Sequence, residues 1–159
     1  MAEAVGLASG VLTLSVFAFK SGTKLYNTIK TFDSLPYQVR ELLTELVSLT
    51  AVLKKLSEVG SLDLEVDLSA LTSTLQQCTR SCNGVETELL TYCSRSGIDR
   101  ASFRDWLKLK CSGGGGIEGF RQQLIGYKAT ITVALSFANL YVFYPPHNPQ
   151  EPAELMTHM

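Results

Sequence analysis

Histidine is scarce in this sequence, and its absence from most of the chain argues against much enzyme and metal chemistry. Only His147 and His158 occur, and both lie close to the C-terminus. No earlier histidine is therefore available to activate a serine or cysteine nucleophile or to ligate a metal. The glycine run at residues 113–116 lacks the Gly-Lys-Ser/Thr sequence that completes a phosphate-binding loop. We expect no enzyme, no catalytic residue, no cofactor and no metal site.

Charge is also sparse. Charged residues make up 18% of the chain, against roughly 25% in an average domain. The 14 basic and 15 acidic side chains give a net charge of −1, so a nucleic-acid partner is not expected. The charges are unevenly placed, because residues 60–94 carry one basic and five acidic side chains and residues 95–128 carry seven basic and three acidic. The basic stretch could meet anionic lipid or an acidic partner, or it could pair with the acidic helix.

The N-terminal residues 4–19 form an apolar run without a charge. A secretory signal begins with a basic region, which Glu3 does not supply, and a spanning helix needs about 20 predominantly apolar residues. The run therefore predicts a helix that is buried in the resting protein, although residence in a membrane stays open. With no secretion signal, we expect a cytoplasmic location and reduced cysteines.

Strand signals are nearly absent, whereas apolar residues recur at helical spacing, which predicts an all-α fold. The expected architecture is an antiparallel helical bundle of four long helices plus one short helix over residues 1–144, followed by a flexible proline-rich tail at 145–159. Beyond the N-terminal helix, we expect a helix of roughly 24 residues with Pro36 in its first turn, and others from Asp67 or Ser69, over 99–110 and over 117–141. The predicted core positions are Val39, Leu42, Leu46, Leu49, Leu53, Leu71, Leu75, Leu89, Trp106, Phe120, Leu124, Tyr127 and Ile131.

Three side-chain groups need an interpretation beyond this pattern. Cys78 and Cys82 stand four residues apart, a spacing that could ligate a metal, but they fall on the apolar face of their helix and are interpreted as core. Glu86 and Glu88 are interpreted as solvated. Additional apolar residues widen the face of the last helix, which we therefore expect to be well buried; they are Ile125, Val133, Leu135, Phe137 and Leu140.

The N-terminal helix is apolar over well more than half of its circumference. A helix of this kind is either central in a bundle or in lipid. Gly6 and Gly10 form a GxxxG pattern that permits close helix packing in either setting. The helix is thus the strongest candidate for a functional element.

Five segments carry a pattern beyond helical spacing, and they are residues 6–12, 25–26, 34–36, 39–49 and 119–131, with Trp106 before the last of them. In this order they resemble the HeLo-like N-terminal domains of fungal STAND or NLR-like receptors, over roughly residues 1–140. That family also includes the N-terminal domain of an azaphilone-pigment cluster protein. It is similar to the HeLo toxins and to the four-helix bundle of the mixed-lineage kinase-like pseudokinase.

The resemblance implies a non-enzymatic domain that induces or regulates programmed cell death, heterokaryon incompatibility or innate immunity. It implies self-association, relocation from the cytoplasm to the plasma membrane, anionic lipid as a partner, and a downstream NTPase domain or a partner NLR-like protein. Lys20 and Lys24 are then expected at the lipid headgroups. The residues expected to enter lipid are Val5, Leu7, Val11, Leu12, Leu14, Val16, Phe17 and Phe19.

A second hypothesis is a soluble helical adaptor that binds another helical domain and never enters lipid. The repeated apolar faces and the opposed acidic and basic segments favour it.

Overall fold

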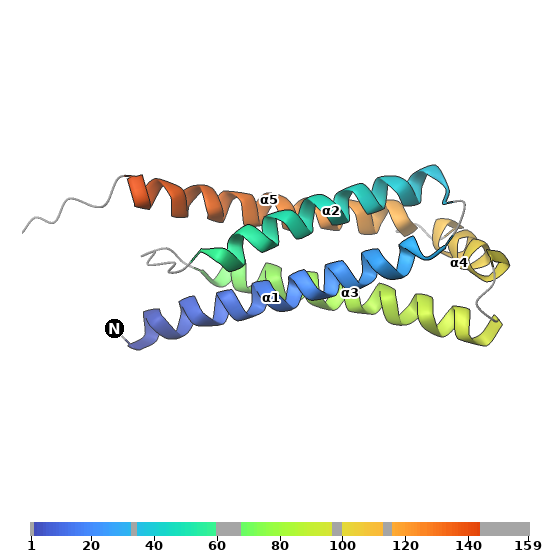
Figure 1. The fold of residues 1–159 in the computed structure, drawn as a ribbon, viewed down its shortest axis with the longest axis horizontal. Helices are drawn as coiled ribbons and strands as arrows, with labels where there is room; N and C mark the ends of the chain where they lie inside the picture. Colours follow the sequence, from blue (N-terminus) through green and yellow to red (C-terminus); the bar gives the residue numbers. More distant parts are fainter. Residues whose placement is uncertain (1, 33–34, 60–67, 97–99, 113–115, 144–159) are drawn as a thin grey trace, which may run out of the picture.

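The computed structural model describes residues 2–32, 35–59, 68–96, 100–112 and 116–143, and within these ranges it contains helices and no strand. The all-α class is therefore confirmed. The predicted tail at 145–159 lies outside the described residues, as do Asp33 and Ser34. The helices are α1 (Ala2–Lys30), α2 (Tyr37–Glu58), α3 (Ser69–Ser96), α4 (Arg100–Ser112) and α5 (Gly116–Phe143) (Figure 1).

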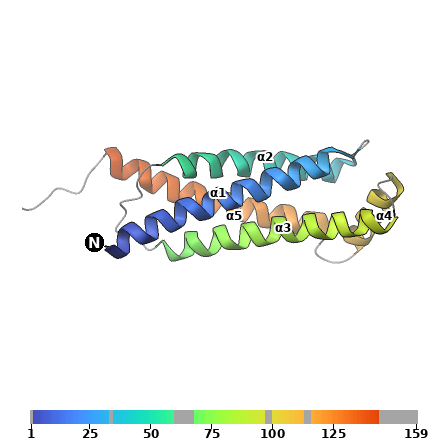
Figure 2. The ribbon, with the colours of Figure 1, turned by 60° about the horizontal axis from the view of Figure 1, so that its bottom comes forward.

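The long helices occupy the corners of a bundle. α1 packs against α2 and α3, and α5 packs against the same two helices, so α1 and α5 lie diagonally opposite. Consecutive long helices run in opposite directions, yet α1 points the same way as α3, and α2 the same way as α5 (Figures 1 and 2). The expectation of an antiparallel bundle is thus wrong for these two neighbouring pairs. Apolar periodicity shows which face of a helix is buried, but it does not show which helix that face meets.

The core face of α2 follows alternating steps of three and four residues from Val39 to Leu56, and every one of its leucines at these positions is buried. The helix begins at Tyr37, and Pro36 stands just before it as the N-cap residue. The carbonyl of Pro36 accepts the N–H groups of Val39 and Arg40, each at 3.1 Å. Pro36 was predicted to lie in the first turn of this helix, but it lies one residue before it. Proline suits this position because its carbonyl can accept these hydrogen bonds, whereas its ring nitrogen has no proton to donate.

The predicted core positions come together in one cluster between the helices. Tyr127 is the partly buried one, and its hydroxyl lies 2.9 Å from the Ser81 hydroxyl on α3. The fully buried ones are Val39, Leu42, Leu46, Leu49, Leu53, Leu71, Leu75, Leu89, Trp106, Phe120, Leu124 and Ile131.

α5 is less buried than its composition predicted. Ile125 and Leu135 are partly buried, but Val133, Phe137 and Leu140 are 55%, 48% and 54% exposed. The reason is that, among the described helices, α5 packs against α2, α3 and α4 alone, so none of these helices covers its outer side. At the other end of α5, hydrogen bonds from Arg121 and Gln122 lower the pKa of Glu118 to about 2.

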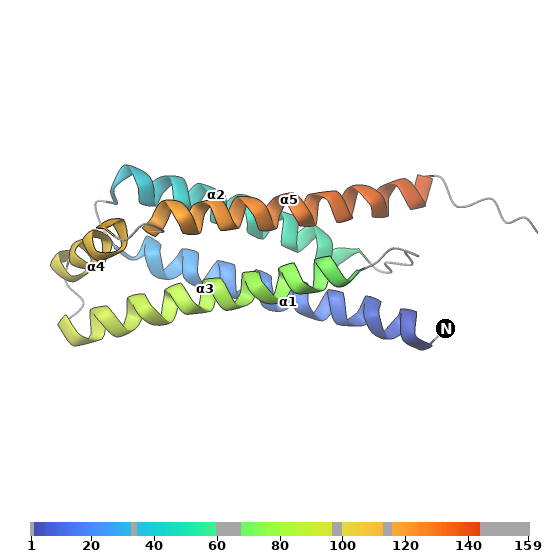
Figure 3. The ribbon, with the colours of Figure 1, turned by 180° about the vertical axis from the view of Figure 1, so that it is seen from behind.

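The short helix α4 lies at the end of the bundle where α1 ends and α5 begins (Figure 3). The Phe103 ring on α4 stacks on Phe32, just after α1, with ring centroids 4.2 Å apart. Trp106 lies 5.9 Å from Phe103 and is 3% exposed. This aromatic stack ties α4 to α1 by burying three large rings together.

Candidate functional site

The N-terminal helix α1 presents two kinds of buried surface to its neighbours. From residue 11 to residue 22 its innermost positions are Val11, Ser15, Ala18 and Gly22, which are mostly small. The Ser15 hydroxyl donates a hydrogen bond to the carbonyl of Leu12 within α1, at 2.7 Å. Farther along the helix, the buried positions on the same face hold two large side chains, Leu25 and Ile29.

The residues predicted to enter lipid are divided by the fold. Val11 is 1% exposed and is a core residue, and Leu12 is partly buried. Leu14 and Phe19 are partly buried and pack on the core, whereas Val16 and Phe17 are 37% and 52% exposed. The side chains of Val5 and Leu7 lie outside the part of the chain whose side chains are described.

Gly22 faces Thr50 of α2 at short range. A Cβ atom at this position would lie 3.0 Å from Cγ2 of Thr50, which is tighter than ordinary van der Waals contact. A side chain at position 22 would therefore require Thr50 to shift.

A buried carboxylate holds the second half of α1. The side chain of Glu86 on α3 is 4% exposed, and its Oε2 lies 3.1 Å from Nζ of Lys24. The hydroxyl of Thr28 lies 3.0 Å from Oε1 of the same carboxylate. A buried carboxylate is costly unless it is paired and hydrogen-bonded, so these contacts bind α1 to α3 at Lys24 and Thr28.

The interpretation of Glu86 as a solvated residue is therefore wrong. The sequence carried a signal for its burial, since Glu86 stands four residues after Cys82 and three before Leu89, on the same helical face as both. Lys24, predicted to meet lipid headgroups, pairs with Glu86 while its side chain stays 69% exposed, and Lys20 is exposed as well.

The two halves of α1 are thus held with different strength. The half after Gly22 buries Leu25 and Ile29 and carries the contacts to Glu86. In residues 10–21, the part of the preceding half whose side chains are described, the one large side chain that is fully buried is Val11, while Leu14 and Phe19 are partly buried. Because stabilisation by burial scales with apolar area, the first half is the easier to displace.

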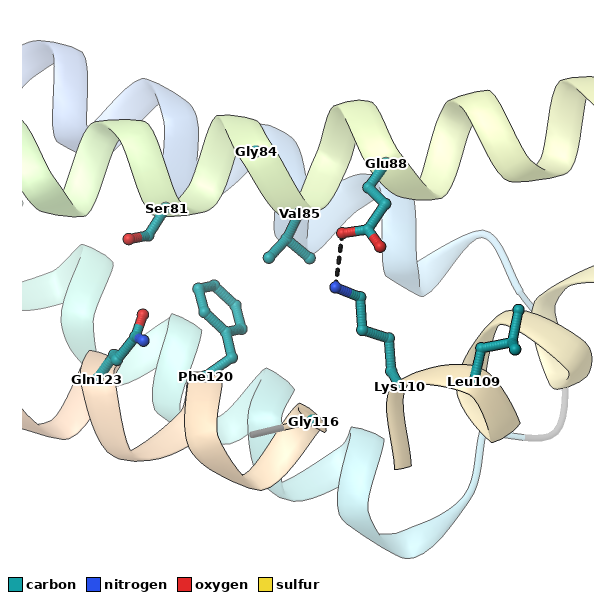
Figure 4. Close-up of a pocket in the computed structure, with 9 residues that line it drawn as sticks. All are labelled: Ser81, Gly84, Val85, Glu88, Leu109, Lys110, Gly116, Phe120 and Gln123. Carbon is teal, nitrogen blue, oxygen red and sulfur yellow. Dashed lines mark ion pairs between the residues drawn. The ribbon is translucent and has the colours of Figure 1, made fainter. Parts of the chain in front are cut away.

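A separate hollow of about 630 Å³ opens between α3, α4 and α5 (Figure 4). Two charged residues in its lining form an ion pair across it, with Nζ of Lys110 2.6 Å from Oε2 of Glu88. Ser81 and Gln123 continue into a neighbouring groove, where the Ser81 hydroxyl is hydrogen-bonded to Tyr127. The hollow is lined by Ser81, Gly84, Val85, Glu88, Leu109, Lys110, Gly116, Phe120 and Gln123.

The cysteines on α3 are core residues. Cys78 and Cys82 are each 0% exposed, and Cys93 is 3% exposed. The hydrogen bond with Cys78, together with burial, raises the pKa of the Cys82 thiol, and burial raises that of Cys93. Within the described residues, no group of three potential metal-ligating side chains comes together.

These thiols should be unreactive in the folded protein. In a Cys111→Ser background, we expect Cys78, Cys82 and Cys93 to react with a thiol reagent only on unfolding, because the reagent needs an accessible thiolate. The measurement is the absorbance of released thionitrobenzoate at pH 8, with and without denaturant. Rapid release of one equivalent before denaturation would contradict it.

Within the ranges that the structure describes, no helix has both the length and the apolar character needed to cross a membrane. Neither a curated protein nor a solved structure matches the chain. A family described as the pigment biosynthesis cluster protein PigL N-terminal domain matches residues 2–145. This match covers almost the whole helical region and agrees with the pigment-cluster part of the resemblance noted from the sequence. The chain belongs to the PigL N-terminal domain family.

Proposed function

We propose that this chain is a HeLo-like bundle of four long helices and one short helix, acting as the N-terminal effector domain of a fungal NLR- or STAND-type protein. It carries out no chemistry. It induces or regulates programmed cell death by oligomerising and by bringing α1 to the plasma membrane.

The observation that carries the proposal is the construction of α1. Its first half turns small side chains (Ser15, Ala18 and Gly22) toward the core, while Phe17 faces outward. Such a segment is expected to lose less buried apolar area on leaving the bundle than the half with Leu25 and Ile29, and it offers an aromatic anchor to a lipid interface. Lys20 follows the apolar run and suits the headgroup level.

The test compares two exposed apolar residues on different helices. Phe17→Glu is expected to abolish dye release from anionic liposomes, since a carboxylate at this position opposes entry into the lipid interface. Val47 on α2 is 51% exposed, which makes Val47→Glu the matched control, and it should release dye like the wild type. Because both residues are exposed, neither substitution should change the midpoint of thermal unfolding by more than a few degrees.

Two outcomes would overturn the proposal. The first is a wild-type protein that leaves anionic liposomes intact even when oligomerised through a fused domain. The second is equal dye release by the wild type and Phe17→Glu. A defined soluble complex with a helical partner and no partition into lipid would favour the adaptor hypothesis instead.

A further inference from the structure

Three of the long helices lose their charges toward the same end of the bundle. Residues 4–19 of α1, 69–79 of α3 and 129–143 of α5 contain no charged residue. The N-terminus of α1, the start of α3 and the end of α5 all lie at one end of the molecule (Figures 1 and 3). α3 packs against both α1 and α5, so around the bundle α3 lies between these two helices.

Two exposed aromatic residues border α3 at this end. Phe17 shares a helical face with Lys24 and Thr28, seven and eleven residues on, and both of these contact Glu86 of α3. Phe137 stands four helical turns after Gln123, which lines the hollow beside α3. The rings are 52% and 48% exposed.

The exposed side chains at the start of α3 are small or uncharged, among them Ser69, Ala70, Ser73, Gln76 and Gln77. Val16 on α1 and Val133 and Leu140 on α5 add exposed apolar area beside the two rings. Phe17, residues 69–77 and Phe137 are called the uncharged face below.

Basic residues mark the inner limit of the uncharged face. Inward from the three uncharged segments, the first charges along the helices are Lys20, Arg80 and Lys128, while Glu3 stands in α1 just before its uncharged segment. The hydrogen bond between Ser81 and Tyr127 places their neighbours Arg80 and Lys128 at the same height along the bundle axis. The contacts of Glu86 with Lys24 and Thr28 place Lys20 within two residues of that height. Lys128 pairs with Glu45 at 2.9 Å, whereas Lys20 and Arg80 are exposed.

The remaining helix differs at this end. α2 carries Lys54, Lys55 and Glu58, all exposed, and it does not pack against α3. Its charges therefore lie away from the middle of the uncharged face. The connection between α2 and α3 contains Asp63, Glu65 and Asp67 and lies outside the described residues, so the face is defined by the helices alone.

We propose that the uncharged face rests on an anionic lipid bilayer in the folded bundle, with Phe137 of α5 as a second anchor beside Phe17 and with α2 turned toward water. An apolar surface with aromatic residues, bordered by exposed Lys20 and Arg80, matches the boundary between acyl chains and anionic headgroups. The serine and glutamine side chains of α3 keep their hydrogen bonds there, since the boundary is only about 5–10 Å deep and remains hydrated. This inference rests on the proposed function and assigns its membrane contact to the folded bundle as well as to α1.

Tryptophan quenching by brominated lipid tests the orientation directly. The only native tryptophan, Trp106, is 3% exposed and lies at the opposite end of the bundle, so the wild type should show no quenching. Phe137→Trp is expected to lose emission as vesicles of brominated phosphatidylcholine and phosphatidylserine are added. Val47→Trp, on the outer side of α2, should behave like the wild type.

The charge contribution is tested by Arg80→Gln. We expect about fivefold weaker binding to vesicles containing phosphatidylserine, because one basic residue near such a surface contributes about 1 kcal/mol. Binding to pure phosphatidylcholine vesicles should be unchanged. Equal loss on both kinds of vesicle would contradict an electrostatic role for Arg80.

The possible failures can be told apart. If the wild type releases dye and Phe17→Glu does not, but Phe137→Trp is not quenched, the proposed function stands and this inference is overturned. If the wild type neither binds nor permeabilises vesicles, the proposed function fails, and this inference with it. If Phe137→Glu converts a lipid-free dimer to a monomer and Phe137→Trp is not quenched, the face belongs to a second copy of the chain.

Discussion

A disulfide between positions 22 and 50 is expected to abolish dye release from anionic liposomes while preserving the folded bundle. A Cβ atom at Gly22 would lie 3.0 Å from Cγ2 of Thr50, so cysteines at these two positions are close enough to join. The Gly22→Cys/Thr50→Cys protein, oxidised, keeps α1 fastened to α2 at position 22, so α1 cannot leave the bundle as a whole.

The same protein supplies its own control. Reduction with dithiothreitol should restore release, which separates the effect of the bond from that of the two substitutions. The buried Cys78, Cys82 and Cys93 do not compete for oxidation, and a Cys111→Ser background removes the fourth thiol. If the oxidised protein releases dye as fast as the reduced one, α1 does not move away from α2 during activity.

The second large effect concerns the stability of α1 itself. Leu25→Ala is expected to lower the free energy of unfolding by about 2–5 kcal/mol, as is usual when a fully buried leucine is truncated. Val11→Ala removes two carbon atoms and should cost about 1.6 kcal/mol before any cavity contribution. Urea unfolding measures both values.

Hydrogen exchange measures independently the difference in stability between the two halves of α1. Amides in residues 11–18 should exchange faster than those in residues 23–29, because local opening is easiest where few large side chains are buried. Equal protection in both segments, together with equal costs for Leu25→Ala and Val11→Ala, would remove the basis for a displaceable first half.

The apolar spacing of the individual helices proved a good guide to their buried faces. In α2 the steps from Val39 to Leu56 predict the buried residues, because an isolated periodicity is a property of one helix. The same reasoning placed Cys78 and Cys82 in the core. It failed for Val133 and Phe137, since an apolar side chain on a helix is buried only where another element covers it.

The contacts of the candidate site could be predicted from the sequence less well than the buried faces of the helices. The apolar run at residues 4–19 singled out α1, but it did not distinguish Val11 in the core from Phe17 on the surface. The partners of Glu86 lie about sixty positions away along the chain, and nothing local indicates that Lys24 and Thr28 reach it. Such a contact depends on the register between two helices.

The sequence by itself therefore determined the helical class, the absence of histidine chemistry from most of the chain and the uncharged run at the start. These properties follow from composition and from short-range spacing, which act within one segment. Only the tertiary structure decided that α1 lies beside α3 in a parallel pair, that the Glu86 carboxylate is buried against Lys24, and that three uncharged helix ends meet at one end of the bundle. The physical reason is that each of these depends on which helices become neighbours and in which direction they run, and the apolar pattern of a single helix is compatible with more than one such arrangement.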